Sequence, residues 1–356
     1  MRRNLTLILC IILLLGYLLT PADALIRPKE PLHRAAQAGD LRTVTNLVAQ
    51  GADVNALDAM IGDAPLHWAA AAGHLDVVKF LVESGADVNL KSRDGQPVIF
   101  AAVYESADIA RYLVEHGANI HVRDRHKETL AHAAVTFRKW ENAEYFISRG
   151  IDLNARNDKG RTALHLFAWY GEDPGLIDAF VAHGADVNLP TYHGVTPLHD
   201  AVRHKRTGIV QALIRAGADV NLEDENGLTP LFLAMGAPLP IVQALVEAGA
   251  EINIQNKYGW SVFHRIPLKG SLEYSGNACE IIEYLVRKGG NINLRDKHGR
   301  TPIYDPARDG DLDVVTCLVE NGADLNVKDQ TGRTPLSWAM LYRQFDVAKF
   351  LRRQLP

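Results

Sequence analysis

The stretch that decides the fold is residues 194–221, GVTPLHDAVRHKRTGIVQALIRAGADVN. Thr196 stands where a helix N-cap is needed, because its hydroxyl can accept a hydrogen bond from a free backbone N–H of the first turn. The proline after it suits the first helical position. Leu198, Ala201 and Val202 follow with the i, i+3, i+4 spacing of a narrow apolar stripe. The pattern predicts a short amphipathic helix that begins just after Thr196.

A second short helix is predicted in the same stretch. Ile209, Val210 and Leu213 form another apolar stripe, and Gly217 can take the positive φ that ends a helix. The chain then runs through Ala-Asp-Val-Asn to a turn near Gly227, after which Thr-Pro-Leu starts the cycle again. Two short helices cannot bury their apolar faces alone, so we expect copies of this unit to stack side by side.

The glycine that ends the second helix recurs at an almost constant interval. The successive separations are 34, 32, 33, 34, 33, 32, 40 and 33 residues, so one unit carries a sizeable insertion. The glycines are Gly51, Gly85, Gly117, Gly150, Gly184, Gly217, Gly249, Gly289 and Gly322. A period of this length indicates an architecture in which each unit contacts its neighbours and no central core is needed.

Two motifs connect this period to a known family. Thr-Pro-Leu-His stands at 196–199, with partial copies at 162–165 and 65–67, and Gly-Ala-Asp-Val-Asn begins at Gly51, Gly85, Gly184 and Gly217. On these motifs the chain resembles the ankyrin-repeat family; the tetratricopeptide repeat has a similar period but lacks both motifs. The resemblance implies an all-α solenoid of about ten helix–turn–helix units joined by hairpin-like turns.

The period also predicts the division of the chain. We expect a signal peptide at 1–24, a linker at 25–30 and an ankyrin-repeat domain at 31–356. The predicted repeats are 31–57, 58–91, 92–123, 124–156, 157–190, 191–223, 224–255, 256–295, 296–328 and 329–356. The insertion falls in the eighth, where Pro267 is predicted to shorten the first helix and residues 269–277 to form a polar loop whose role is open.

The first 24 residues have the three-part plan of a secretory signal peptide. Arg2 and Arg3 precede an apolar run over residues 5–19, and Ala22-Asp23-Ala24 supplies small residues at the positions that a signal peptidase recognises. The run is short for a membrane span, which needs about 20 apolar residues. We therefore expect cleavage after Ala24 and a secreted or periplasmic protein. An uncleaved run that anchors the protein in a membrane is the alternative.

The two cysteines outside the leader are predicted to be buried thiols. Cys279 lies ten residues before Gly289, whereas Cys317 lies five residues before Gly322. Both belong to second helices of adjacent repeats, but the offset is expected to keep their Cα atoms more than about 7 Å apart, which is too far for a disulfide.

Catalytic, metal-binding and cofactor-binding sites are not expected. The histidines His67, His132, His165, His199 and His264 each take the fourth place of the Thr-Pro-Leu-His motif. In the resembling family this imidazole bonds threonine and backbone and keeps repeats in register, and copies one repeat apart are too distant to share a metal. Signatures of nucleophilic, phosphate-binding and zinc chemistry are missing from the sequence. A net charge of −4 gives no case for nucleic acid.

What remains is a surface that binds a protein. The resemblance implies binding at a concave side formed by turn tips and first helices, and aromatic and arginine side chains are concentrated at those positions in repeats five to eight. The candidate protein-binding residues are Trp169, Tyr170, Tyr192, His193, Arg203, His204, Tyr258 and Trp260. The bland alternative is that some of these rings pack against the next repeat.

The function predicted from these observations is a non-enzymatic scaffold or adaptor in the periplasm or outside the cell. We expect a monomer with no cofactor, whose partner is a protein of unknown identity and which meets a membrane only if the leader is kept. The alternatives are a secreted pathogen effector that acts on a host protein and a membrane-tethered organiser.

Overall fold

The computed structural model describes residues 30–268 and 276–355 and divides into two compact units, Met1–Arg125 and His126–Pro356. Throughout the described residues the regular elements are helices, and the β-structure is a single isolated bridge between Lys91 and Pro97. The all-α prediction is therefore confirmed.

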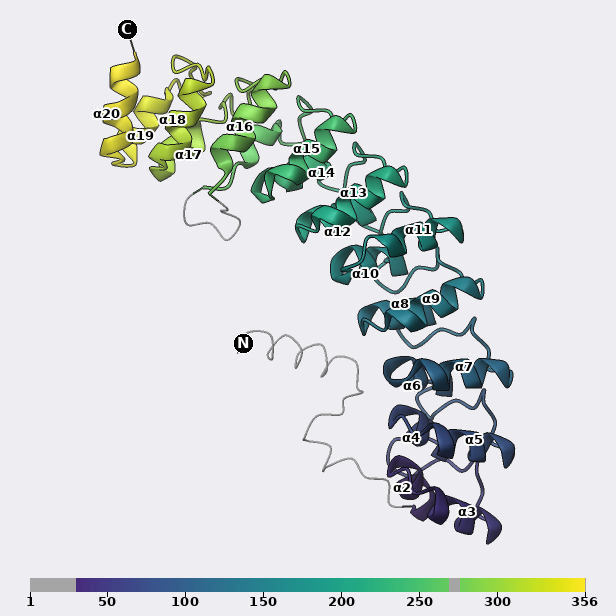
Figure 1. The fold of residues 1–356 in the computed structure, drawn as a ribbon. Coiled ribbons are helices and arrows are strands. Elements are labelled where there is room, and N and C mark those ends of the chain that lie inside the picture. The colour runs from purple at the N-terminus through teal and green to yellow at the C-terminus, as the bar shows by residue number, and fades with distance from the viewer. Residues whose placement is uncertain (1–29, 269–275, 356) are drawn as a thin grey trace. The chain divides into compact units, whose positions relative to one another are not determined.

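In the first unit, three helix pairs follow one another and stack side by side (Figure 1). Its helices are α2 (Pro31–Gln37), α3 (Leu41–Ala49), α4 (Pro65–Ala71), α5 (Leu75–Glu83), α6 (Val98–Glu105) and α7 (Ala107–Glu115). First helices pack against first helices, as α2 does on α4, and second helices pack against second helices, as α3 does on α5.

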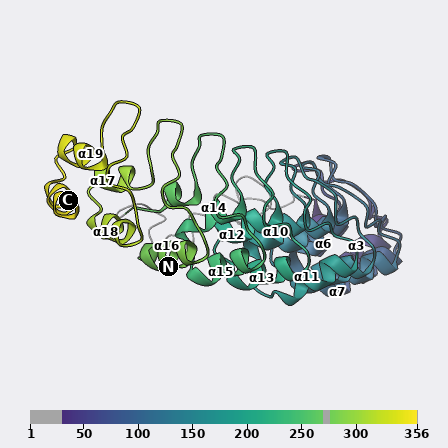
Figure 2. The same cartoon turned by 90° about the horizontal axis from the view of Figure 1, so that it is seen from above.

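The second unit repeats this arrangement. Its helices are α8 (Leu130–Thr136), α9 (Trp140–Ser148), α10 (Ala163–Tyr170), α11 (Gly175–Ala182), α12 (Pro197–Arg203), α13 (Thr207–Arg215), α14 (Pro230–Leu233), η2 (Ala234–Gly236), α15 (Leu239–Glu247), η3 (Val262–Arg265), α16 (Ala278–Arg287), α17 (Tyr304–Asp309), α18 (Leu312–Glu320), α19 (Pro335–Leu341) and α20 (Phe345–Gln354). Within each unit, long loops extend from the same edge of successive helix pairs (Figure 2).

The core consists of the apolar stripes that the sequence predicted. Leu198 and Ala201 on α12 and Val210 and Leu213 on α13 are fully buried. Thr196 caps α12 by accepting a hydrogen bond from the backbone N–H of the third helical residue, and a proline occupies the first helical position. Burial of such stripes against the neighbouring repeats stabilises helices that are too short to persist alone.

In five repeats the motif histidine joins the repeat to the next one. Nδ1 of His165 accepts a hydrogen bond from the backbone N–H of Thr162, so the proton of the neutral ring is on Nε2, which donates to the carbonyl oxygen of Val195 at 2.9 Å. Equivalent bonds join His67 to Gln96, His132 to Arg161, His199 to Leu228 and His264 to Arg300. Burial lowers the pKa of His67 and of His165 to about 4, which keeps the rings neutral at pH 7. The structural role predicted for these histidines is confirmed.

A tyrosine takes over this role in repeat nine. Tyr304 occupies the motif's histidine place, and its hydroxyl lies 2.8 Å from the carbonyl oxygen of Arg333 and 2.6 Å from that of Val327. An imidazole or a phenol can therefore supply the donor at this place. In repeats three and seven the place is taken by Phe100 and Phe232, which are buried and cannot donate, so those repeats pack on the next one without this bond.

The asparagine that closes most repeats forms a second ladder; in repeat three its place is taken by His121. Asn188 donates from Nδ2 to the carbonyl oxygen of Gly217 and accepts from the backbone N–H of Asp219 at 2.8 Å. The same pair of bonds is made by Asn55, Asn89, Asn154, Asn221, Asn253 and Asn293. The asparagine of the Ala-Asp-Val-Asn motif is thus an inter-repeat connector after the second helix in the repeats that carry it.

Two repeats of the second unit depart from the pattern. In repeat seven the first helix is a short α14 continued by η2. In repeat eight it is reduced to η3, which ends just before Ile266 and Pro267, as predicted. Of the predicted polar loop, residues 269–275 lie outside the described residues.

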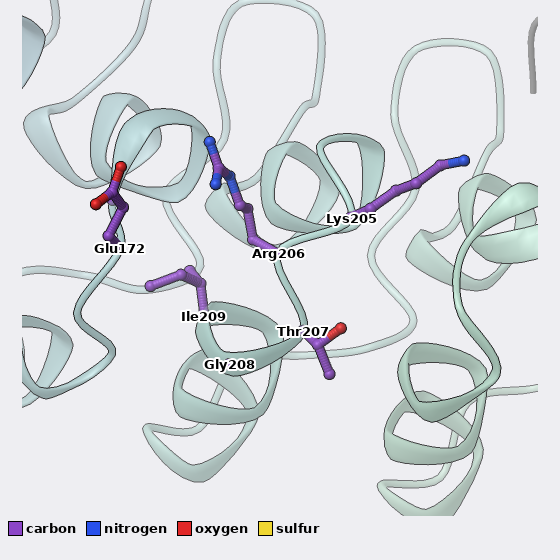
Figure 3. A pocket seen from close by; sticks show the side chains of 7 residues that line it. Glu172, Lys205, Arg206, Thr207, Gly208 and Ile209 are labelled. Carbon is purple, nitrogen blue, oxygen red and sulfur yellow. The ribbon is translucent and has the colours of Figure 1, made fainter.

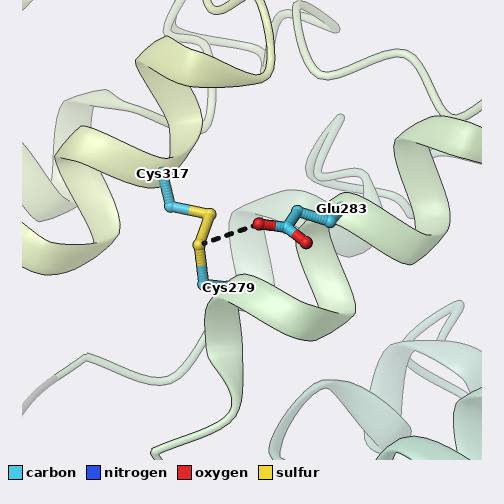
Figure 4. Close-up of side chains that lie close together, drawn as sticks. All are labelled: Cys279, Glu283 and Cys317. Atoms are coloured by element: carbon cyan, nitrogen blue, oxygen red, sulfur yellow. Dashed lines mark hydrogen bonds between the residues drawn. A yellow bond between two sulfur atoms is a disulfide. The ribbon is translucent and has the colours of Figure 1, made fainter.

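The prediction of two free thiols is wrong, because Cys279 and Cys317 form a disulfide with a Cα–Cα distance of 5.7 Å (Figure 4). The prediction assumed that α16 and α18 lie in step along their axes. An offset of five residues would then separate the cysteines by about 7.5 Å along the axes alone. The structure instead places the first turn of α16 beside the middle of α18. A carboxylate oxygen of Glu283 lies 3.8 Å from Sγ of Cys279.

The predicted signal peptide, residues 1–24, lies outside the described residues. Among residues 30–268 and 276–355, each helix is too short or too polar to cross a bilayer.

The disulfide gives a direct prediction. Reduction, or replacement of both cysteines by serine, should lower the stability of the region around α16 and α18 by about 2–4 kcal/mol, because the bond closes a loop of 38 residues. Thermal unfolding with and without reductant, together with the mass of the alkylated chain, measures this.

The Cys279→Ser, Cys317→Ser variant is the control, since reductant should leave its unfolding unchanged. Alkylation of both cysteines in folded protein purified without reductant would contradict the assignment.

Candidate functional site

Four of the predicted residues meet on the first-helix side of repeats five and six. Trp169 and Tyr170 end α10, Arg203 ends α12, and His204 follows it. The ring of Trp169 stacks on that of His204 with centroids 4.3 Å apart and an interplanar angle of 18°. Tyr170 stacks on Trp169 at 5.5 Å. The structure therefore brings this subset together, and we call Trp169, Tyr170 and His204 the aromatic stack.

Two arginines fix the stack in place. The guanidinium carbon of Arg161 lies 4.6 Å from the ring centroid of Trp169, within the range of a cation–π contact. Nε of Arg206 donates to the backbone oxygen of Trp169 at 3.2 Å. Because these groups come from successive repeats, the stack is held by packing between repeats. Its rings are therefore partly structural, as the bland alternative held.

A buried carboxylate that the sequence analysis missed lies under this cluster. Asp200 is 0% exposed, and both of its oxygens lack hydrogen-bond partners. Nε of Arg161 lies 3.9 Å away. Burial raises the pKa of Asp200 to about 6, and Arg161 and Arg203 oppose the shift. The sequence could have indicated a buried carboxylate here, because the position equivalent to Asp200 is leucine in repeats five and seven (Leu166 and Leu233).

The predicted residues of the sixth turn lie at a loop tip. Tyr192 is 61% exposed, and the guanidinium carbon of Arg156 lies 5.9 Å from its ring centroid. Nδ1 of His193 lies 2.8 Å from a carboxylate oxygen of Glu225 on the next tip. Because this pair is solvent-exposed, we expect it to contribute less than about 1 kcal/mol to the free energy of unfolding.

The last two predicted residues form a separate pair at the eighth turn. Tyr258 and Trp260 have ring centroids 5.8 Å apart, and Tyr258 is 50% exposed. Nζ of Lys257 lies 5.3 Å from the ring of Tyr258. Trp260 is three repeats further along the stack than Trp169. The predicted residues therefore form a row along one side of the second unit, not a single pocket.

A hollow of about 280 Å³ lies next to the aromatic stack (Figure 3). Gly171 and Glu172 line it from repeat five, and Lys205, Arg206 and Thr207 line it from repeat six. Glu172 lies in the loop between α10 and α11. Figure 3 shows the side chain of Arg206 directed to the side of the hollow on which Glu172 lies, while Lys205 points away along the next repeat. The hollow is open and shallow, so it can receive a protruding side chain of another macromolecule.

The buried carboxylate predicts an unusual pH dependence. Folded Asp200 binds its proton more tightly than the unfolded chain does, so its charged form destabilises the fold at neutral pH. This destabilisation becomes smaller as the pH falls below about 6, which is the pKa of Asp200 in the folded protein. It continues to decrease toward about pH 3.9, the pKa of an aspartate in the unfolded chain. Asp200→Leu should raise the free energy of unfolding by about 1–3 kcal/mol at neutral pH and by less near pH 5.

Chemical denaturation at several pH values measures this difference, and titration of other groups cancels between the two proteins. The exposed Asp178 on α11, replaced in the same way, is the control and should leave the pH dependence unchanged. A variant less stable than the parent at every pH would show that Asp200 makes a favourable interaction in the fold.

Comparison with known proteins agrees with this geometry. The family model for ankyrin repeats in three copies matches residues 12–92, 32–124, 90–157, 130–224, 168–256, 206–274 and 271–354. Among solved structures, the chain is similar to the ankyrin repeat domain of Bcl-3, described as a member of the IkappaB protein family. The identity is 28% with a TM-score of 0.54, over 62% of this chain and all of that one.

Curated relatives match over shorter stretches. The chain is 43% identical over 72 residues to the NF-kappa-B p105 subunit of Gallus gallus and 41% identical over 61 residues to NF-kappa-B inhibitor delta of Mus musculus. The matches cover 20% and 17% of this chain but only 7% and 18% of those relatives. The family model, in contrast, matches nearly the whole described part of the chain. The protein therefore belongs to the ankyrin-repeat family.

Proposed function

We propose that this protein is a non-enzymatic scaffold that holds a protein partner along the first helices and loop tips of its second unit. The observation that carries the proposal is the row of aromatic and basic side chains on that side, from the aromatic stack to Tyr258 and Trp260. Tyrosine, tryptophan and arginine dominate the binding energy of protein interfaces. Similarity to a member of the IkappaB family supports a binding role.

The rigidity of this side also supports binding. The aromatic stack is fixed by Arg161 and Arg206, so little side-chain entropy remains to be lost when a partner binds. The tip of the sixth turn is fixed too, because the carbonyl of Val195, which accepts the bond from His165, directly follows Gly194. Residues at this tip, such as Tyr192, therefore extend from a defined base.

We further propose that the protein acts in an oxidising compartment, either secreted or periplasmic. The Cys279–Cys317 disulfide supports this location, because disulfides persist outside the reducing cytosol. The three-part leader ending at Ala24 supports the same location independently.

The location is tested by N-terminal sequencing of the protein from fractionated cells. The expected result is a soluble mature chain that starts at Leu25. A chain that keeps residues 1–24 and sediments with membranes would instead favour the tethered alternative.

The binding surface is tested by capture and cross-linking. The mature chain should retain a protein from its own compartment, and cross-links should fall on the first helices and loop tips of repeats five to eight. Trp169→Ala together with Trp260→Ala should weaken capture by more than about tenfold, because each change removes a large aromatic contact.

Arg215→Ala, an exposed change on the second helix α13, is the control and should leave capture intact. A competing surface exists in the last repeat, where Leu341 is 57% and Phe345 73% exposed. Cross-links confined to that repeat, with capture unaffected by the tryptophan changes, would reject the proposed surface.

A further inference from the structure

Basic side chains surround the aromatic stack in a chain whose net charge is −4. They are Arg138 after α8, Arg161 before α10, Arg203 at the end of α12, and Lys205 and Arg206 before α13. We refer to these five residues as the basic cluster. Negative net charge is what keeps a chain of this composition soluble. The local excess of positive charge therefore needs another explanation.

The acidic groups beside the cluster are already engaged or buried. Glu128 accepts a hydrogen bond from Nδ2 of Asn157 at 3.3 Å. Glu172 pairs with Arg138 at 3.0 Å. Asp200 is fully buried beneath Arg161 and presents no carboxylate to solvent. Arg203 and Lys205 are therefore available to attract the negative charges of a binding partner.

The effect on His204 shows the sign of the local field. Its pKa is lowered by burial and then by Arg203, Arg206 and Arg161, so every charged group that shifts this pKa is cationic. At neutral pH the imidazole is uncharged and serves as a stacking surface, while the arginines around it set a positive potential.

We propose that the basic cluster receives an acidic segment of the protein partner, rich in aspartate or glutamate, whose carboxylates pair with Arg203, Lys205 and Arg206 beside the aromatic stack. This inference rests on the proposed function and specifies the chemistry of the partner. Carboxylates suit the cluster because guanidinium groups bind them in a bidentate manner. The hollow beside Glu172 and Arg206 offers space for a side chain of the same segment.

The geometry favours a polypeptide over nucleic acid. Single-stranded nucleic acids bind through bases that stack on open aromatic faces. The ring of Trp169 is instead already in contact with His204, Tyr170 and Arg161. The cluster is also confined to repeats four to six and does not extend as a stripe along the stack, as a phosphate backbone would require.

The experiment measures binding of a short fluorescent glutamate-rich peptide to the mature chain by anisotropy, at low and at high salt. The peptide should bind at low salt, its glutamine counterpart should not, and salt should weaken the binding. Arg203→Gln together with Lys205→Gln should weaken binding roughly three- to tenfold, because each exposed charge pair contributes modestly.

The matched control is Arg287→Gln together with Lys288→Gln, at the exposed end of the second helix α16. It changes the net charge equally and should leave binding within about twofold of the parent. Equal loss in both variants would overturn the proposal, since it would show a response to net charge alone. Tighter binding of an oligothymidylate that shows the same Arg203 and Lys205 dependence would also overturn it.

Failure here can be separated from failure of the scaffold function. If Trp169 and Trp260 are required for capture of a natural partner but the glutamate-rich peptide does not bind, the surface stands and the acidic chemistry is rejected. If neither tryptophan matters for capture, the surface itself is rejected.

Discussion

One hydrogen bond recurs in five repeats and sets their register, from the buried imidazole of one repeat to a loop carbonyl of the next. A stack of short helix pairs has no central core, so its stability is approximately a sum of repeat and interface contributions. His165 and His199 in the second unit and His67 in the first make this bond with distances of 2.9 to 3.1 Å. Each ring is buried and neutral, and each carbonyl would otherwise be an unsatisfied group at an interface.

The same bond connects the fold to the candidate site. Its acceptor is the residue directly after the turn glycine, so each bond fixes the base of one loop tip. Val195 anchors the tip that carries Tyr192 and His193. Arg161 accepts from His132 through its backbone and contacts Trp169 through its side chain. One residue therefore takes part both in the register of the repeats and in the arrangement of the aromatic stack.

The parts of the structure that could be predicted from the sequence are those that recur. Threonine caps, apolar stripes and motif histidines follow the period, and the structure confirms them where the motif is kept. Thr229, which is followed by Phe232 in the histidine place, makes no side-chain cap bond. The features that the sequence analysis missed each occur only once in the chain. The Cys279–Cys317 bond depends on how α16 and α18 are displaced along their axes, which the position of a glycine does not encode. Tyr304 preserves a hydrogen bond through a different side chain.

The candidate site shows the same limit. Counting along the repeat located Trp169, Arg203 and His204 on one side of the stack, but it did not show that His204 and Trp169 touch. It also overlooked Asp200, whose burial with both carboxylate oxygens lacking hydrogen bonds is a local cost. Departures from the repeat pattern, more than the pattern itself, distinguish this protein from other stacks of the same kind.

The most direct test of this account is amide hydrogen exchange in His165→Ala. Loss of the imidazole leaves the carbonyl of Val195 unsatisfied, which costs about 1–3 kcal/mol at that interface. The account predicts faster exchange over residues 157–170 and 191–203, with little change over residues 304–355. Exchange that is unaltered at these loop tips, or that rises equally along the whole second unit, would contradict it.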